Sequence, residues 1–206
     1  MEYRAVGKRC AVILESLHLP IPSIEVISLL ESHGFRFLSV DILELARSYI
    51  GSVSYQRGAA QANAPELVDC SSFTKWLFGQ RGILLPRMAI QQRQHGHIID
   101  PSELTALDLV FTTNGVSFYH DNPNDGVGHV GVVTDIQTVI HATKKAGSVV
   151  EMPIEEFIGK KKFRGARRYI PNDHHLHTVT VPEDIEIETS DDLRYFVFRQ
   201  LPKEQW

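Results

Sequence analysis

Cysteine is scarce in this chain: Cys10 and Cys70 are the two cysteines among its 206 residues. Two thiols cannot form the disulfide framework of a small secreted domain, and they cannot supply the ligands of a cysteine-rich zinc site. One bridge between them would be possible, but the setting of Cys70 favours a reactive thiol instead. Any cysteine chemistry in this protein is therefore expected to depend on one side chain.

Long hydrophobic runs and a strong net charge are also lacking. No apolar stretch approaches the ~20 residues that a bilayer-spanning helix needs. Near the start, Lys8 and Arg9 precede an apolar run from Cys10 to Leu14, which Glu15 ends. A secretory signal needs an apolar run of roughly 7–15 residues, so we expect no signal peptide and a protein that is cytoplasmic or exported by a signal-independent route. The net charge of −4 gives no electrostatic reason to expect nucleic acid or a membrane as partner.

What is present is typical of a globular protein, with 43% hydrophobic and 22% charged residues. Helical patterns come first and β patterns follow, and this segregation predicts an α+β fold with helices packed on a central antiparallel sheet. We expect three parts: a helical N-terminal extension at 1–40, a central domain at 41–170, and a C-terminal β extension at 171–206 packed on that domain.

Capping residues and periodicity predict the individual elements. Ser23 and Asp41 are expected to open helices, which Gly34 and Gly51 follow as terminators. A short surface helix is expected in the polar stretch 87–96. The expected strands of the central domain are 109–112, 116–119, 129–135, 138–142, 148–151 and 163–170. In the tail, runs at 178–188 and 195–201 are expected to pair with each other or to extend the sheet.

The stretch around Cys70 carries the clearest chemical signal. Asp69 is a good N-cap residue, so Cys70 is expected in the first turn of a helix that Gly82 terminates. The residues that follow at helical spacing form one apolar face, and Cys70 belongs to it. A thiol in the first helical turn feels the positive end of the helix dipole, which favours the thiolate. Cys70 is therefore a candidate nucleophile.

A cysteine nucleophile needs a base nearby in space. His129 begins an alternating strand after a Gly-containing loop, and His141 lies in the next strand of a predicted hairpin. A base and the group that orients it are well placed on adjacent strands, so we predict that His129 takes the Cys70 proton and His141 fixes the His129 ring. His141 could instead be a hydrogen-bonded core histidine.

Six short motifs then occur in the order of a known family: Ala46–Gly51, Asp69–Phe73, Gly82–Arg87, Asp108–Phe111, Gly128–Val133 and Val139–Ala142. Together they cover about residues 41 to 170, and over this range the chain resembles the NlpC/P60 cysteine peptidases, papain-like hydrolases of bacterial cell-wall peptides. The resemblance implies that 41–170 is a catalytic domain with a papain-like fold.

The resemblance also implies roles for single residues. It implies a triad of Cys70 as nucleophile, His129 as base and His141 as orienting residue. It implies substrate-binding roles as well, for Tyr55 near the oxyanion and for Asp69 and Ser71 facing the substrate. Alternative roles remain open, since Tyr55 could be a packed loop aromatic and Asp69 a helix cap alone.

The implied reaction is hydrolysis of an amide bond in peptidoglycan stem peptides, between D-glutamate and a diamino acid, through an acyl-enzyme. No cofactor and no metal are required, and the sequence gives no indication of the oligomeric state. Two alternatives stay open: the same triad acting as an amidase or acyltransferase on a non-wall substrate such as an effector or toxin, or a catalytically inactive binding module.

Some features depart from the family pattern. Ser72 replaces the family's usual glycine, and Thr105-Ala106 replaces its usual Pro-Gly. The stretch 113–127 is longer than usual and could form a wall or lid beside His129. In the tail, Asp173 lies beside histidines 174, 175 and 177; a metal site is conceivable there, but a solvated loop is the favoured interpretation.

Overall fold

The structure, a computed structural model, describes residues 2–113, 126–172 and 175–202. The expected strand at 116–119, most of the possible lid at 113–127, and Asp173 and His174 of the tail lie outside the described residues. The chain divides into two compact units: Met1–Val40, Phe78–Leu84 and Pro171–Trp206 form the first, and Asp41–Leu77 and Leu85–Ile170 form the second.

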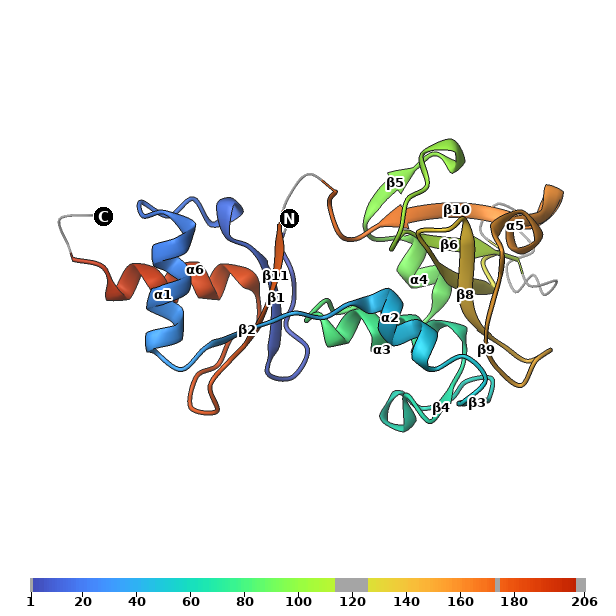
Figure 1. The fold of residues 1–206 in the computed structure, drawn as a ribbon, viewed down its shortest axis with the longest axis horizontal. Coiled ribbons are helices and arrows are strands. Elements are labelled where there is room, and N and C mark those ends of the chain that lie inside the picture. The colour runs from blue at the N-terminus through green and yellow to red at the C-terminus, as the bar shows by residue number, and fades with distance from the viewer. Residues whose placement is uncertain (1, 114–125, 173–174, 203–206) are drawn as a thin grey trace. The chain divides into compact units, whose positions relative to one another are not determined.

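The second unit contains a six-stranded sheet, in the order β5-β10-β6-β7-β8-β9, in which all neighbouring strands run antiparallel (Figure 1). Its strands are β5 (His97–Ile99), β6 (Leu109–Thr112), β7 (His129–Val133), β8 (Thr138–Thr143), β9 (Ser148–Pro153) and β10 (Phe163–Arg168). A short parallel pair, β3 (Ser54–Tyr55) and β4 (Leu67–Val68), precedes it. The expected mixture of helices with an antiparallel sheet is confirmed.

The helices of the second unit are α2 (Ile42–Ser48), α4 (Ala89–Arg93), α5 (Ile154–Lys162), the short 3-10 helices η2 (Gln61–Asn63) and η3 (Pro101–Glu103), and most of α3 (Cys70–Gln80), whose last turn belongs to the first unit. Asp41 caps α2 as expected, because its carboxylate accepts hydrogen bonds from two N–H groups of the first turn. Helix α5 packs on one face of the sheet, where Ile154 and Phe157 join a buried cluster with Val110, Val133 and Ala166.

Hairpin geometry places β7 beside β8. Val133 pairs with Val139, so the chain reverses over Asp135–Gln137 as the sequence predicts. Strand β10 pairs with both β5 and β6, so it lies inside the sheet. At the start of β6, the buried Asp108 accepts two 2.8 Å hydrogen bonds from the guanidinium of Arg168, the last residue of β10, and these bonds tie the two strand ends together.

The first unit has its own sheet and its own core. Its elements are β1 (Arg9–Ile13), the 3-10 helix η1 (Leu14–Leu17), α1 (Ser23–Ser32), β2 (Arg36–Leu38), β11 (Leu176–Thr180) and α6 (Ser190–Gln200). The strand order is β1-β11-β2, with antiparallel pairing throughout. Leu30 and Leu193, from opposite ends of the chain, are both fully buried in one apolar cluster. Neither end of the sequence could bury such a core alone.

Two expectations about the chain ends are wrong at the level of secondary structure. Residues 9–13 form a strand within the segment expected to be helical, because Cys10–Ile13 are consecutive buried residues, which a short buried strand accommodates. Residues 190–200 form a helix where 195–201 was expected to be a strand. The Asp192 carboxylate accepts hydrogen bonds from the N–H groups of Glu188 and Thr189, and the apolar pair Leu193 and Val197 is buried at i, i+4 spacing. The expected three-part division into domains stays a prediction.

Candidate active site

Helix α3 begins at Cys70, and Asp69 caps it. The Asp69 carboxylate accepts a 2.8 Å hydrogen bond from the N–H of Ser72, and the Ser72 hydroxyl in turn accepts a 2.8 Å bond from the N–H of Asp69. This reciprocal cap gives the Ser72 side chain a structural role at the helix start. Cys70 is 7% exposed and Phe73 and Leu77 are fully buried, so the expected inward face of the helix is confirmed.

Arg87 holds the cap from the other side. Its guanidinium donates to both Asp69 oxygens, at 3.0 and 2.6 Å, and to the Ser71 hydroxyl at 3.1 Å. The N–H of Gly58 donates to Asp69 as well. Burial alone would raise the pKa of Asp69, but the hydrogen bonds from Arg87, Ser72 and Ser71 hold that pKa below its usual value. Asp69 is therefore a charged carboxylate with both oxygens engaged by the protein.

Gln92 forms hydrogen bonds with the first turn of α3 from the protein interior. Its side chain is fully buried, donates to the carbonyls of Ser71 and Pro86, and accepts from the Thr74 hydroxyl at 2.9 Å. The polar composition of residues 87–96 predicts a surface helix and indicates no role for Arg87 or Gln92. The available signal was weak, since Arg87 closes one family motif and nothing in the spacing of Gln92 marks it as buried.

The two predicted histidines meet on adjacent strands. Nε2 of His129 lies 2.8 Å from Nδ1 of His141, and both side chains are buried. Gly131 makes this approach possible, because a Cβ there would lie 2.3 Å from Cγ1 of Val139 and 3.1 Å from Cβ of His141. The glycine of the predicted strand is therefore a requirement of the close packing between β7 and β8.

Apolar and soft side chains surround the two rings. The Phe157 ring of α5 lies 5.5 Å from the His129 ring and 4.9 Å from the His141 ring, measured between centroids. Sδ of Met152 lies 3.2 Å from Nε2 of His141. Nδ1 of His129 is buried and has no hydrogen-bond partner among the residues that the structure describes. One ring nitrogen is thus left open for a reacting group.

Cys70 lies beside the histidine strand, since its sulfur accepts a hydrogen bond from the N–H of Val130, the residue after His129. Burial raises the pKa of the Cys70 thiol to about 12, and the Asp69 charge adds to the rise, while the N–H groups of Val130 and Ser71 act against it. The expectation that the helix start stabilises the thiolate is therefore wrong for this closed site, because desolvation outweighs the helix end.

The pKa values of the two histidines are lowered, whereas that of Cys70 is raised. Burial lowers the pKa of His129 to about 3, and repulsion from His141 adds to the fall although Asp69 opposes it. Burial also lowers the pKa of His141 to about 4. The thiol of Cys70 and the two imidazoles are therefore in their neutral forms at neutral pH. In this state a proton leaves Cys70 only as the sulfur attacks.

Tyr55 belongs to the same neighbourhood. It pairs with Val68 in the strand that leads to Cys70, and burial, Cys70 and Asp69 all raise the pKa of its phenol. The structure thus gathers Tyr55, Asp69, Ser71 and Cys70 around the start of α3. Their roles in binding or catalysis stay predictions.

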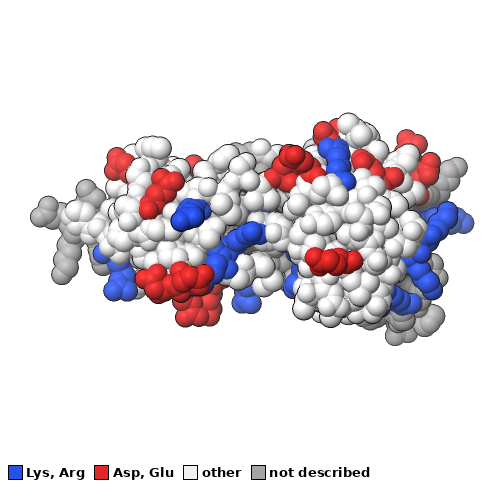
Figure 2. All heavy atoms as spheres, turned by 60° about the horizontal axis from the view of Figure 1, so that its bottom comes forward, with Lys and Arg blue, Asp and Glu red and all other residues white. Residues whose placement is uncertain are grey.

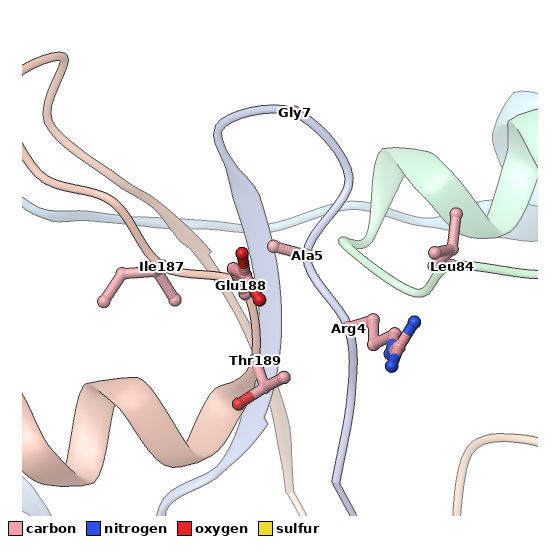
Figure 3. Close-up of a pocket in the computed structure, with 7 residues that line it drawn as sticks. All are labelled: Arg4, Ala5, Gly7, Leu84, Ile187, Glu188 and Thr189. Atoms are coloured by element: carbon pink, nitrogen blue, oxygen red, sulfur yellow. The ribbon is translucent and has the colours of Figure 1, made fainter.

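Outside this neighbourhood, the described parts of the chain contain a hollow and no cluster of metal-binding side chains. A hollow of about 320 Å³ in the first unit is lined by Arg4, Leu84, Glu188 and neighbouring residues, without cysteine or histidine (Figure 3). Across the described ranges, no three His, Cys, Asp or Glu side chains gather as a metal site would require. No helix within those ranges is long and apolar enough to cross a membrane. On the face drawn in Figure 2, acidic and basic side chains are interspersed.

Known proteins are similar to this chain in sequence. The chain is 32% identical over 103 residues to a γ-D-glutamyl-L-lysine dipeptidyl-peptidase of Bacillus cereus. The match covers 50% of this chain and 29% of the relative. The chain is 29% identical over 131 residues to a γ-DL-glutamyl hydrolase of Bacillus subtilis, covering 63% of this chain and 29% of the relative. The matched segment spans less than half the length of each of these relatives.

Solved structures agree with the sequence relatives. A crystal structure of an NlpC/P60 family protein from Bacillus cereus matches with a TM-score of 0.54 and 27% identity, over 64% of this chain and 40% of that one. The model of the NlpC/P60 family matches residues 53–168, more than half of the chain and the segment that carries Cys70, His129 and His141. The chain belongs to the NlpC/P60 family, and its second unit has the family's papain-like fold.

Proposed function

We propose that this protein is a cysteine peptidase that hydrolyses γ-D-glutamyl–diamino acid bonds in peptidoglycan stem peptides. The observation that carries the proposal is that Cys70, at a capped helix start, accepts a hydrogen bond from the N–H of Val130, next to His129, whose ring is hydrogen-bonded to His141 and has Nδ1 open. The names of two relatives, a γ-D-glutamyl-L-lysine dipeptidyl-peptidase and a γ-DL-glutamyl hydrolase, support the choice of a γ-glutamyl bond.

The proposed hydrolysis starts from a neutral Cys70 thiol and a neutral His129 ring. Sγ of Cys70 attacks the γ-carbonyl carbon while its proton passes to Nδ1 of His129. The backbone N–H of Cys70, at the helix start, and the Tyr55 hydroxyl stabilise the oxyanion. The proton on His129 then goes to the leaving amine, and a thioester remains on Cys70. Water, deprotonated by the same histidine, releases the acid and regenerates the thiol.

Two further residues have supporting roles in this proposal: His141 orients the base His129, and Asp69 holds the turn that carries Cys70. In this proposal the His129–His141 contact fixes the His129 ring, so that Nδ1 can accept the Cys70 proton. Because both oxygens of Asp69 already accept hydrogen bonds from protein groups, we assign Asp69 chiefly to holding the Cys70 turn.

Substitution of the nucleophile tests the proposal. Cys70→Ala is expected to abolish release of peptide from muropeptides, as followed by mass spectrometry, with the circular dichroism spectrum unchanged. Cys10→Ala, at the buried free thiol of the first unit, is the matched control and should keep turnover. Undiminished turnover by Cys70→Ala would refute the assignment.

One observation favours a second candidate, a peptidoglycan-binding domain without turnover: burial opposes ionisation of both Cys70 and His129. The two candidates differ in a direct way. The native protein would bind muropeptides and return them uncleaved if the second candidate were correct, and Cys70→Ala would bind equally well. An amidase or acyltransferase acting on a non-wall substrate would likewise leave muropeptides unchanged, but would modify its own substrate in a Cys70-dependent way.

A further inference from the structure

The His141 ring stands between two partners, one at each nitrogen. Nδ1 of His141 lies 2.8 Å from Nε2 of His129, and Nε2 of His141 lies 3.2 Å from Sδ of Met152. Met152 comes from β9, where it pairs with Val139, two residues before His141 on β8. Three strands thus contribute to one line of contacts that runs from Met152 through His141 to His129.

The chemistry of the thioether fixes the direction of these hydrogen bonds. A methionine sulfur carries no proton and can only accept. Its contact with His141 is therefore a hydrogen bond only when Nε2 of His141 carries the proton. A neutral imidazole has one N–H, so Nδ1 of His141 is then an acceptor, and Nε2 of His129 must be the donor to it. The single proton of His129 is thereby used, and Nδ1 of His129 keeps a free lone pair.

The opposite set of tautomers loses contacts at both ends. Nε2 of His141 would turn a lone pair toward the sulfur, and that hydrogen bond would disappear. Nδ1 of His129 would carry a proton at a buried position that has no partner among the described residues. Both rings are neutral, because burial lowers the pKa of each, so the tautomer rather than the charge decides which nitrogen can accept a proton.

We propose that Met152 is a positioning residue: by accepting a hydrogen bond from Nε2 of His141 it fixes the tautomers of both histidines and leaves Nδ1 of His129 as the base. This inference rests on the proposed function in one respect, that Nδ1 of His129 receives the Cys70 proton. Met152 acts through His141 and has no contact with the reacting atoms in this assignment.

Two substitutions separate the role of Met152 as a hydrogen-bond acceptor from its role in packing. Met152→Leu keeps an apolar side chain of similar volume and removes the acceptor, whereas Met152→Glu keeps the length and supplies an acceptor that has no proton at neutral pH. The same exchange at the exposed Met88, Met88→Leu, is the control for loss of a thioether as such. Met152 is partly buried beside the α5 cluster, which suits both replacements.

The experiment reads the tautomers and the turnover separately in the full chain labelled with ¹⁵N-histidine. Nitrogen chemical shifts should show protons on Nε2 of both His129 and His141 in the native protein and in Met152→Glu. In Met152→Leu, the proton of each ring should move partly or wholly to Nδ1. Its kcat should fall about tenfold or more, with KM little changed, while Met152→Glu and Met88→Leu stay within about threefold of native.

The two readouts keep the proposals distinguishable. Native tautomers in Met152→Leu would overturn the role of Met152, whether kcat falls or not, because a fall would then come from packing alone. A native protein with protons on Nδ1 of the two rings would overturn it as well. The tautomers are measured without substrate, so they decide this inference even if the native protein cleaves no muropeptide, a result that counts against the proposed function alone.

Discussion

At the scale of single residues, the site depends on one small residue, Gly131, and on the burial of Cys70 and His129. Gly131 leaves room for the His141 side chain, and burial keeps Cys70 and His129 uncharged. The residue types and their order along the chain were enough to predict the capped helix start at Cys70 and the hairpin that carries His129 and His141, because both are local features; the triad itself stays a prediction. The pKa directions were not predictable, since burial arises only when distant elements pack.

Gly131 offers a sharp test of the histidine geometry. Gly131→Ala adds a methyl group 2.3 Å from Val139 and 3.1 Å from Cβ of His141, so β8 must move away from β7. We expect the free energy of unfolding to fall by about 1–3 kcal/mol, as for other overpacked cores, and kcat to fall as His141 leaves His129. Urea unfolding and steady-state kinetics measure the two effects. Gly79→Ala, where the new methyl group would be 3.3 Å from Val6, should keep native kcat; equal losses in both variants would contradict the account.

The lowered pKa of His129 predicts the pH dependence of turnover. The neutral ring accepts the Cys70 proton, and with a pKa of about 3 it stays neutral as the pH falls through the ordinary histidine range. The thiol, with a pKa of about 12, stays protonated on the alkaline side. We therefore expect kcat/KM to be level between about pH 5 and about pH 9.

The same shift predicts the pH dependence of folding. Below about pH 6.5 the unfolded chain binds a proton at His129 that the folded chain does not bind, so stability falls as the pH decreases toward the folded-state pKa. Because the protein loses stability at low pH, circular dichroism must show that it is still folded at each pH where kcat/KM is measured. An acidic limb in kcat/KM with a midpoint near 6.5, measured on folded protein, would show that His129 has an ordinary pKa.

At the scale of elements, the segment from Pro86 to Arg93 holds the start of α3 in place. Arg87 binds the Asp69 carboxylate, and Gln92 binds the Ser71 carbonyl from within the core. Periodicity predicted a polar surface helix here, since it registers polarity and not the tertiary partners that bury a glutamine. Helix α6 was missed for a related reason: its aromatic residues favour a strand locally, and its caps and its buried Leu193 decided otherwise.

Removing the cation beside Asp69 tests this element. The Asp69 side chain is 10% exposed, so Arg87→Met leaves a nearly buried carboxylate without its charged partner. We expect a loss of about 2 kcal/mol in the free energy of unfolding, reduced from the cost at fully buried pairs because Arg87 is one-third exposed. Urea titration measures it.

Arg47→Met is the matched control for that experiment. Arg47 pairs with Asp135 on the surface, where the carboxylate is 60% exposed, so its loss should cost much less stability than the loss of Arg87. If the two variants lose equal stability, the bond between Arg87 and Asp69 does no more than a surface pair.

At the scale of the whole molecule, the chain contains two units with separate cores, and the family match lies mainly within the second. Strands β6 to β10 of the second unit could be predicted one by one, because each is a short local pattern, whereas β3, β4 and β5 were missed. The first unit could not, because β1 pairs with β11 from the other end of the sequence and neither segment has a core without its partner. Cys10 belongs to the first unit and Cys70 to the second, so the two thiols make independent reporters.

The central claim is that Cys70 forms a thioester with the γ-glutamyl acyl group. The most direct measurement is a rapidly quenched reaction of the whole protein with a synthetic stem peptide, followed by peptide mapping in a mass spectrometer. The account predicts an adduct with the mass of the N-terminal acyl fragment on the Cys70 peptide, none on the Cys10 peptide, and none in Cys70→Ala. Cleavage of the stem peptide with no adduct on Cys70, and at the same rate in Cys70→Ala, would contradict it.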